Sequence, residues 1–499
     1  MTVPLPESAN LEHLKGQAKT LLQQLRAQEP EALARIAGLP ATPPYRLAEA
    51  QLAIAREYGF ESWAKLKRHV TGFTTRRDAL FAAIRSGDHG EVRKLLKPDP
   101  ALVHARDPNA FGSTTLTAAV NREDIPMIDL LLEFGANPEA RSDWWAGGFG
   151  PLDFGSDATS DHLLTRGAKL TAHAAARLGR AAALKEILAK NPDVIHERGG
   201  DGQFPLHFSK TPEIVDILVD AGSDLEARDI DHEGTALQFQ IKNELVAKRL
   251  FERGAKLDVF SAIILDQTEI LEQILDKDPE AVSRGINQPG NPDIPVAPGA
   301  HIYTYTLGFF QPQQVATHFG RWAAYDVLWA KSRPAMRVAM AAWRGERETA
   351  LKVVEENPGV IAEMRPEDMQ MLPAAAWNRR LSVVRLFLEL GFDPNVQDGE
   401  GMTAVARGSF HGFFDIVEAI LPYKPDLTIQ NVYGGTPLTT SLYGSVNGWR
   451  KDGDYAKTLE LLIAAGSPLP DHVRGSAAAQ AVLRRHGVPE ANPSEPPQT

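Results

Sequence analysis

The sequence predicts an all-α fold, a solenoid of about twelve short helix-turn-helix units preceded by a helical cap. The first observation is a complete two-helix unit at residues 112–141. The second is that the same pattern recurs at a period of about 33 residues along most of the chain. The third is that residues 1–70 do not fit this period, although their apolar residues are spaced as in helices.

The unit at residues 112–141 reads GSTTLTAAVNREDIPMIDLLLEFGANPEAR. Thr114 is suited to cap a short first helix through its hydroxyl group. Pro126 fits the first turn of a second helix, whose apolar face includes Leu130–Leu132, and Gly135 is suited to end that helix. Two helices this short cannot bury such a face alone, so neighbouring units must stack against each other.

This stretch resembles the ankyrin repeat, in which the following residues stand at the family's spacing: Thr114, Leu116, Ala119, Leu130–Leu132, Gly135, Ala136 and Asn137. It departs from the family's T-P-L-H signature at Thr115 and Thr117, where the family has Pro and His. The resemblance implies a stack of helix pairs whose finger-like turns and first helices line a concave surface. It also implies a protein that binds other proteins, which favours a scaffold over an enzyme.

The first 70 residues form the predicted cap. Leucines from Leu11 to Leu25 at helical spacing predict one helix, a second is expected from about residue 46 to 58, and Ser62 is suited to open a third. Residues 56–70, REYGFESWAKLKRHV, resemble the small helical segment ahead of the repeats in some bacterial ankyrin proteins. Such a segment would cover the apolar flank of the first repeat.

The predicted solenoid spans residues 78–489, and its third unit, residues 151–170, is shortened. A Pro/Gly-rich interruption lies at 284–300, and an excess of residues lies around 443–454 in the last clear unit. Insertions in repeat proteins commonly map to the binding face, so both are expected to be exposed loops there. Residues 490–499, rich in Pro, Glu and Ser, are expected to be a disordered tail.

Composition and motifs exclude several classes of function. The net charge of -11 argues against a non-specific nucleic-acid binder, and no apolar run approaches the roughly 18 residues of a membrane span. Zero cysteines exclude disulfides and thiolate metal sites. The N-terminus lacks an apolar signal region, which predicts a cytoplasmic protein. Because no phosphate loop, dinucleotide fingerprint or HExxH is present, no catalytic residue, metal or cofactor is predicted.

Three groups of residues depart from the repeat. Two tryptophans and a phenylalanine lie in one finger. At least one of the tryptophans is expected to contact a partner. The alternative is that both fill the gap left by the shortened third repeat. Asp229, Asp231, His232 and Glu233 crowd the next finger, which we interpret as a solvated turn. His301, Tyr303 and Tyr305 alternate, which predicts a strand with all three on one face. The predicted binding surface comprises Trp144, Trp145, Phe149, His232, His301, Tyr303, Tyr305, Tyr433 and Trp449.

The leading functional prediction is a scaffold that binds a protein partner on its concave surface. An acidic and locally aromatic surface suits a basic or amphipathic partner segment. The alternative is a pocket enclosed by the curved array, in which His232, His301 and Tyr303 bind a small molecule or a metal, with or without catalysis. A deep cavity lined by these groups would favour the alternative, and a shallow groove would favour the scaffold.

Overall fold

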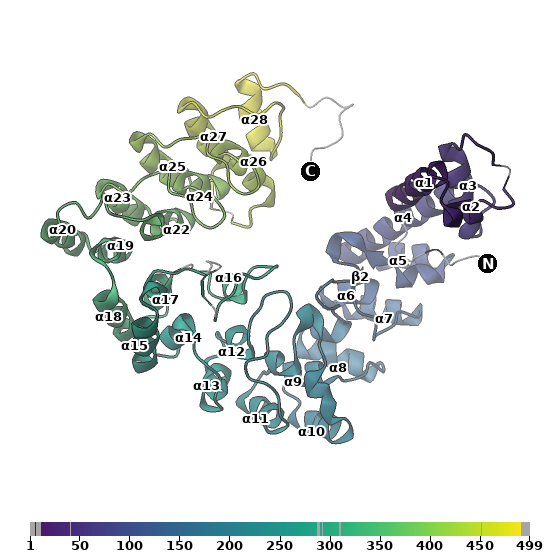
Figure 1. Ribbon diagram of the computed structural model, residues 1–499, viewed down its shortest axis with the longest axis horizontal. Coiled ribbons are helices and arrows are strands. Elements are labelled where there is room, and N and C mark those ends of the chain that lie inside the picture. Colours follow the sequence, from purple (N-terminus) through teal and green to yellow (C-terminus); the bar gives the residue numbers. More distant parts are fainter. Residues whose placement is uncertain are drawn as a thin grey trace. The chain divides into compact units, whose positions relative to one another are not determined.

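The structure is a computed structural model, and it describes Leu5 and residues 11–490 except 40, 287–289, 292, 309–310 and 451. The described chain is mostly helical, which agrees with the predicted all-α class (Figure 1). It divides into two compact units, residues 1–231 and 232–499. Of the predicted disordered tail, only Glu490 lies within the described residues, where it pairs with Arg484.

The N-terminal segment is a small helical bundle with its own core. Its helices are α1 (Leu11–Arg26), α2 (Pro30–Arg35), α3 (Leu47–Glu57) and α4 (Trp63–Ser86). Leu14, Leu21 and Ile54 are among the residues that fill its core. Ser62 caps α4 by accepting a hydrogen bond from the Lys65 backbone N–H. This helix then continues unbroken through residues 71–77, between the predicted cap and the predicted repeats, and packs against the next helix as the first member of a pair.

The rest of the first unit consists of helix pairs joined by turns. Its α-helices are α5 (His89–Leu96), α6 (Thr115–Val120), α7 (Ile125–Glu133), α8 (Asp157–Thr165), α9 (Ala172–Leu178), α10 (Ala181–Lys190) and α11 (Pro212–Asp220). Its 3-10 helices are η1 (Pro100–His104), η2 (Pro108–Ala110), η3 (Pro151–Asp153), η4 (Pro192–His196), η5 (Gly200–Gly202) and η6 (Pro205–Phe208). The strands β1 (Arg106–Asp107) and β2 (Ser113–Thr114) pair antiparallel. The shortened third repeat has only η3 in place of its first helix.

The pair α6 and α7 shows why the unit at residues 112–141 folds as predicted. The Thr114 hydroxyl accepts a hydrogen bond from the Thr117 backbone N–H and so caps α6. Thr115, where the family has proline, donates its hydroxyl proton to the Val103 carbonyl oxygen at 2.6 Å. Both Thr115 and Thr117 are 1% exposed. The Thr115 hydroxyl thus links α6 to η1 of the preceding segment.

The second unit continues the pattern of helix pairs. Its helices are α12 (Ala236–Phe239), α13 (Glu244–Glu252), α14 (Val259–Ile264), α15 (Thr268–Lys277), η7 (Pro279–Val282), α16 (Ile302–Thr306), α17 (Pro312–His318), α18 (Trp322–Lys331), α19 (Pro334–Arg344), α20 (Arg347–Glu356), α21 (Pro366–Met369), α22 (Met371–Trp377), α23 (Leu381–Glu389), α24 (Ala404–Phe410), α25 (Phe414–Ile420), η8 (Leu421–Tyr423), α26 (Pro437–Asn447), α27 (Tyr455–Ala464) and α28 (Ala477–Arg485). In Figure 1, α22, α24 and α26 stack as one row and α23, α25 and α27 as another.

The Pro/Gly-rich interruption at 284–300 is not wholly the exposed loop that the sequence predicts. Ile294 is 1% exposed, and the Asp293 carbonyl oxygen accepts a hydrogen bond from the Gln238 side chain at 2.8 Å. Val296, by contrast, is 60% exposed. The interruption packs its isoleucine against the repeat because an apolar side chain gains more from burial than from exposure to water.

The excess around 443–454 is partly helical rather than a loop. Helix α26 extends to Asn447, and α27 begins at Tyr455, 18 residues after Pro437, whereas α25 begins 10 residues after Ala404. Tyr443 lies inside α26 and is 62% exposed. The predicted exposure is therefore confirmed at this position, and the predicted loop is shorter than expected.

Candidate functional site

The predicted tryptophan pair lies in a turn of the first unit, between α7 and η3. Trp145 is 59% exposed. Trp144 is partly buried and packs edge-on against Phe111, with ring centroids 4.4 Å apart. Phe149 packs against Phe154 of the same repeat at 5.3 Å. Trp144 thus attaches this finger to the preceding one, and Trp145 is the aromatic side chain that the finger presents to solvent.

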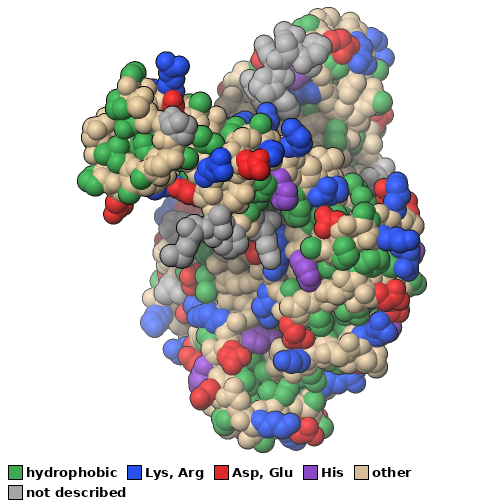
Figure 2. All heavy atoms as spheres, turned by 90° about the vertical axis from the view of Figure 1, so that its right-hand side faces the viewer, with side chains coloured by type: hydrophobic (Ala, Val, Ile, Leu, Met, Phe, Trp, Pro, Cys, Tyr) green, Lys and Arg blue, Asp and Glu red, His purple; other side chains and the backbone are tan. Residues whose placement is uncertain are grey.

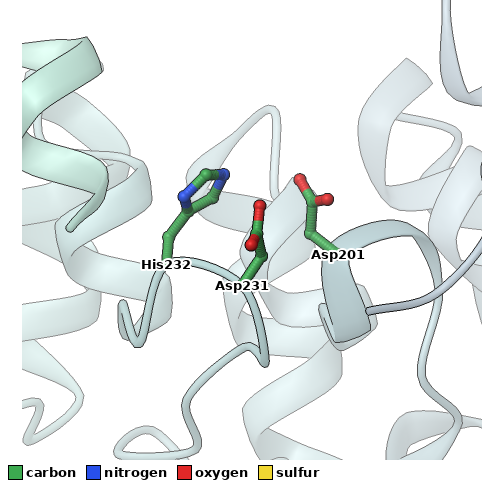
Figure 3. Close-up of side chains that lie close together, drawn as sticks. All are labelled: Asp201, Asp231 and His232. Atoms are coloured by element: carbon green, nitrogen blue, oxygen red, sulfur yellow. The ribbon is translucent and has the colours of Figure 1, made fainter. Parts of the chain in front are cut away.

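The acidic finger is more buried than a solvated turn. Asp229 and Asp231 are 3% and 5% exposed. The backbone N–H groups of Ile230 and Asp231 donate to the Asp201 carbonyl oxygen at 2.9 and 3.3 Å, so this finger folds onto the preceding one. Figure 3 shows Asp201 and Asp231 with their carboxylates on the same side, together with His232, the next residue in the chain. The interpretation as a solvated turn is therefore wrong for these aspartates.

His301, Tyr303 and Tyr305 do not form the predicted strand. His301 caps α16 by accepting a hydrogen bond from the Tyr303 backbone N–H at 3.2 Å. Because the segment is helical, residues that are two positions apart in the sequence point in different directions. His301 and Tyr303 are 0% exposed, whereas Tyr305 is 62% exposed and donates its hydroxyl proton to the Gly299 carbonyl oxygen. His232 lies against Tyr305, with ring centroids 5.2 Å apart.

Tyr303 belongs to a buried network around Asp258 rather than to an open site. One Asp258 carboxylate oxygen accepts hydrogen bonds from the Phe260 and Ser261 backbone N–H groups at 2.8 and 2.9 Å. The other accepts from Gln238 at 2.8 Å and from the Tyr303 hydroxyl at 2.7 Å. Burial raises the pKa of Asp258, and the hydrogen bonds oppose that rise. Such a network ties α16 to α14 and has no exposed member at its centre.

The second unit carries an aromatic arrangement that the sequence analysis missed in part. Trp377, Phe410 and Tyr443 are the seventh residues of α22, α24 and α26. The ring centroids of Trp377 and Phe410 are 5.5 Å apart, and those of Phe410 and Tyr443 are 6.2 Å apart. We call these three residues the aromatic ladder. Each side chain is contributed by a separate repeat, so the stacking of the repeats builds the ladder.

Trp449, which the sequence predicts as a binding residue, packs on this ladder. Its ring lies 5.6 Å from Trp377 and 5.7 Å from Phe410, and the side chain is nevertheless 64% exposed. His411 fills the space beneath, 4.2 Å from Trp377 and 5.2 Å from Trp449, and is 1% exposed. Burial, followed by the nearby Arg450, lowers the pKa of His411 to about 4. Trp449 thus presents an aromatic surface that is supported from below.

The side chain of Arg407 packs against the ladder. The Arg407 guanidinium lies 4.8 Å from the centre of the Trp377 ring and is 6% exposed. It donates to the Asp398 carboxylate at 2.6 Å and to the Glu400 carboxylate at 2.8 Å. This pairing neutralises the buried cation and fixes its planar group against the tryptophan.

A second pair of arginines holds the loop that carries Trp449. Arg379 and Arg450 both lie over the Phe413 ring, at 4.8 and 4.7 Å. Both donate to the Asp452 carboxylate at 3.0 Å. The hydrogen bond from Arg450, and then that from Arg379, lowers the pKa of Asp452 to about 2. The loop is therefore attached to the preceding repeat by the charged contact between Arg379 and Asp452.

Gly444 allows α26 to approach α24 closely, and it offers a test of the ladder. A Cβ at this position would overlap the Phe410 carbonyl oxygen. We expect Gly444→Ala to lower the free energy of unfolding by about 2 kcal/mol, because overpacking outweighs the gain in helix propensity. Gly72→Ala is the matched control, since its Cβ would meet nothing within 4 Å in α4, and it should stabilise the protein by about 1 kcal/mol. Urea unfolding of both variants measures the difference, and effects of the same sign would contradict the expected overlap.

Tyr433, the remaining predicted site residue, projects from the turn before α26. Its side chain is 80% exposed, and that of its neighbour Val432 is 66% exposed. The Val432 backbone N–H donates to the Glu400 carbonyl oxygen at 3.1 Å, and the Tyr433 backbone N–H donates to the Asn431 side chain at 3.0 Å. The turn is thus held by its backbone while its two apolar side chains remain in water.

The sequence contains the signal that would have found the ladder. Trp377, Phe410 and Tyr443 are each 33 residues from the next, which is the period of the repeat itself. Residues at the same position in stacked units must lie next to each other. Aligning the last three units by their first helices would therefore have predicted these contacts.

The distribution of surface charge and the apolar character of the helices are two further features of the described chain. On the face that Figure 2 presents, the described Lys and Arg side chains are interspersed with Asp and Glu. Across the described residues, no helix combines the length and the apolar character needed to cross a lipid bilayer.

Comparison with known families identifies the repeat type at the ladder. Residues 372–421 match the family described as ankyrin repeats (many copies). The match supports an ankyrin-repeat protein. The matched ankyrin segment contains α23, α24 and α25 together with nearly all of α22, and so carries two of the three ladder positions.

Two further comparisons complete this result. Comparison with curated proteins gives no match. Among solved structures, the chain is similar to one described as a predatory endopeptidase from Bdellovibrio bacteriovorus in complex with an immunity protein. The sequence identity is 25%, the alignment covers 35% of this chain and 97% of that chain, and the TM-score is 0.25. At this TM-score the likeness carries no argument about fold or function.

Proposed function

We propose that the helix pairs form an ankyrin solenoid of about twelve units that binds a protein partner through the aromatic ladder and Trp449. Ankyrin repeats in general bind proteins. The observation that supports this site most strongly is Trp449 itself, whose side chain is 64% exposed although it packs on two ladder rings. A large aromatic side chain held rigidly in water is typical of an interface anchor.

The neighbours of Trp449 extend the apolar surface available to a partner. Tyr443 and Val446 lie on α26 and are 62% and 63% exposed. Tyrosine and tryptophan lose little conformational freedom on binding and bury large areas, so they contribute strongly to interfaces. A partner that covers these side chains would remove apolar surface from water at about 25 cal/mol per Å².

The rim of this surface indicates the chemistry of the partner. The Glu400 side chain is 47% exposed beside the buried Arg407, and the whole chain has a net charge of -11. An amphipathic segment could place its apolar side on Trp449 and a basic side chain near Glu400. The proposed partner is therefore an amphipathic, basic segment of another protein.

The other predicted site residues have different parts in this proposal. Trp145 and Tyr433, at 59% and 80% exposed, are further positions suited to contact a partner. His301 and Tyr303 are fully buried, and the Tyr303 hydroxyl is bonded to Asp258. We therefore assign these two residues a structural role and do not base a catalytic or metal-binding pocket on them.

The experiment compares Trp449→Ala with a matched exposed tyrosine outside the ladder, Tyr423→Ala, which is 45% exposed in wild type. A partner recovered from cell lysate with the full-length chain is identified by mass spectrometry, and its affinity for each variant is measured by calorimetry. Trp449→Ala should weaken binding by about 2 kcal/mol or more, which is roughly 30-fold, with little loss of stability. Tyr423→Ala should bind as wild type. Unchanged affinity of Trp449→Ala, or an equal loss in both variants, would refute the proposed site.

A further inference from the structure

A second feature of the same unit lies away from the ladder, in a cavity of about 550 Å³ between α17, α19 and the α22–α23 turn. Its lining includes Gln314, Trp322, Trp343, Glu346 and Arg380. This volume lies in the range of sites that hold small organic molecules. The lining combines aromatic rings with a few polar groups, which is the usual composition of such sites.

Arg380 is the cation of this cavity that lacks a counter-charge. Its guanidinium lies 4.4 Å from the centre of the Trp343 ring. Among the described residues no carboxylate forms an ion pair with it, and burial alone lowers its pKa. Arg344, also in the lining, is by contrast paired with Glu346 at 2.6 Å. A partly buried guanidinium over an aromatic ring is suited to bind an anion from outside the chain.

Gln314 is a buried polar residue in the lining of this cavity. The residue is 1% exposed, and its side-chain oxygen accepts a hydrogen bond from the Gln311 backbone N–H at 3.1 Å. Its side-chain nitrogen is buried and has no hydrogen-bond partner within the described chain. A buried donor without an acceptor is unfavourable by about 1–3 kcal/mol, and this nitrogen is closed off from solvent.

The two tryptophans define the shape of the proposed site. Trp343 is fixed by a hydrogen bond from its indole N–H to the Thr317 hydroxyl at 3.0 Å. Trp322 is 51% exposed and lies under the Arg344 guanidinium at 4.8 Å. Trp343 is thus largely buried, at 4% exposed, whereas Trp322 offers an exposed aromatic surface to the apolar part of a ligand.

We propose that this cavity binds a free organic carboxylate, held by the Arg380 guanidinium, with its apolar part against Trp322. A monoanion suits the site because Arg380 is the lining arginine left without an acidic partner, while Glu346 brings a negative charge that disfavours a dianion such as phosphate. The bidentate geometry of guanidinium and carboxylate provides the specificity. The cavity and the aromatic ladder use different residues, so either site can fail without the other.

The test uses 3-phenylpropionate and its neutral amide, 3-phenylpropionamide, titrated into the full-length protein by calorimetry at pH 7.5. The acid should bind about tenfold or more tightly than the amide, because only the acid forms charge-assisted hydrogen bonds with Arg380. Arg380→Gln should reduce the affinity for the acid to that for the amide. Arg385→Gln, an exposed arginine on the next helix turn, is the matched control and should bind as wild type.

Four results would overturn the proposal: no binding of the acid at about 10 mM, equal affinity for acid and amide, equal binding of inorganic phosphate, or full affinity in Arg380→Gln. Thermal melts establish that each variant is folded. If Arg380→Gln does not fold, Arg380→Lys replaces it in the test. Lysine keeps the charge but not the planar pair of donors, so the affinity for the acid should fall by a smaller factor and still exceed that for the amide. Unchanged affinity of Arg380→Lys would then refute bidentate binding.

Discussion

Acidification from pH 7.5 to pH 5 should lower the free energy of unfolding by about 2 kcal/mol through His411 alone. The ordinary pKa of histidine, 6.5, applies to the unfolded chain, and the pKa in the folded protein is about 4. The unfolded state therefore binds the proton first as the pH falls. The contribution of His411 to stability is fully present above pH 6.5 and is lost progressively as the pH falls toward 4. Its cause is the burial of His411 beneath Trp449 and Trp377.

The measurement is urea unfolding at both pH values, followed by tryptophan fluorescence, for wild type and His411→Gln. Carboxylates titrate in both proteins, so their contribution cancels in the comparison. The variant should be less stable than wild type at pH 7.5 but should lose about 2 kcal/mol less on acidification. His196→Gln, at an exposed histidine, should keep the wild-type pH dependence. Equal pH dependence in wild type and His411→Gln would show that this histidine is not held neutral by the fold.

Asp258→Ala should lower the free energy of unfolding by about 3 kcal/mol. The substitution removes the cap of α14, which is generally associated with a loss of about 1 kcal/mol. It also leaves the buried Tyr303 hydroxyl without its acceptor, which adds about 1–3 kcal/mol. Gln238 contributes less because its nitrogen keeps the bond to the Asp293 carbonyl oxygen. This loss of stability comes from hydrogen bonds and does not require a change in protonation, so it should be measurable at neutral pH.

Asp454→Ala is the matched control for this prediction. Asp454 also caps a helix of the second unit, α27, by accepting a hydrogen bond from the Lys457 backbone N–H at 3.0 Å. Among the described residues, no buried side chain donates to its carboxylate, so its removal should lower stability by only about 1 kcal/mol. Chemical denaturation of both variants separates the cap from the network. Equal losses would mean that the bonds from Tyr303 and Gln238 to Asp258 contribute little.

The local signals in the sequence predicted most of the helical structure because each acts within a few residues. Ser62 and Thr114 cap helices as expected, and the apolar spacing from Leu11 to Leu25 forms one helix. The alternation of His301 and Tyr303 misled because a pattern of five residues fits one helical turn as well as a strand. Short apolar patterns of this kind do not distinguish the two structures.

The candidate sites were harder to predict because they depend on contacts between distant segments. The exposure of Trp449 was expected, but the burial of His411 depends on the loop after α26 folding back over the ladder. That no described carboxylate pairs with Arg380 likewise depends on where the nearby acidic side chains lie in three dimensions. The ladder, by contrast, can be recognised in the sequence from the equal spacing of Trp377, Phe410 and Tyr443.

Each repeat contributes one ring to the ladder, and this limits how the aromatic surface can change in evolution. Each ring occupies the same position of α22, α24 or α26, so tandem duplication of one repeat would lengthen the aromatic surface by one whole step. A substitution within a repeat would alter the chemistry of one step and leave the length unchanged. The reach of the surface and its local specificity can thus vary separately, the first by copying segments of the gene and the second by point mutation.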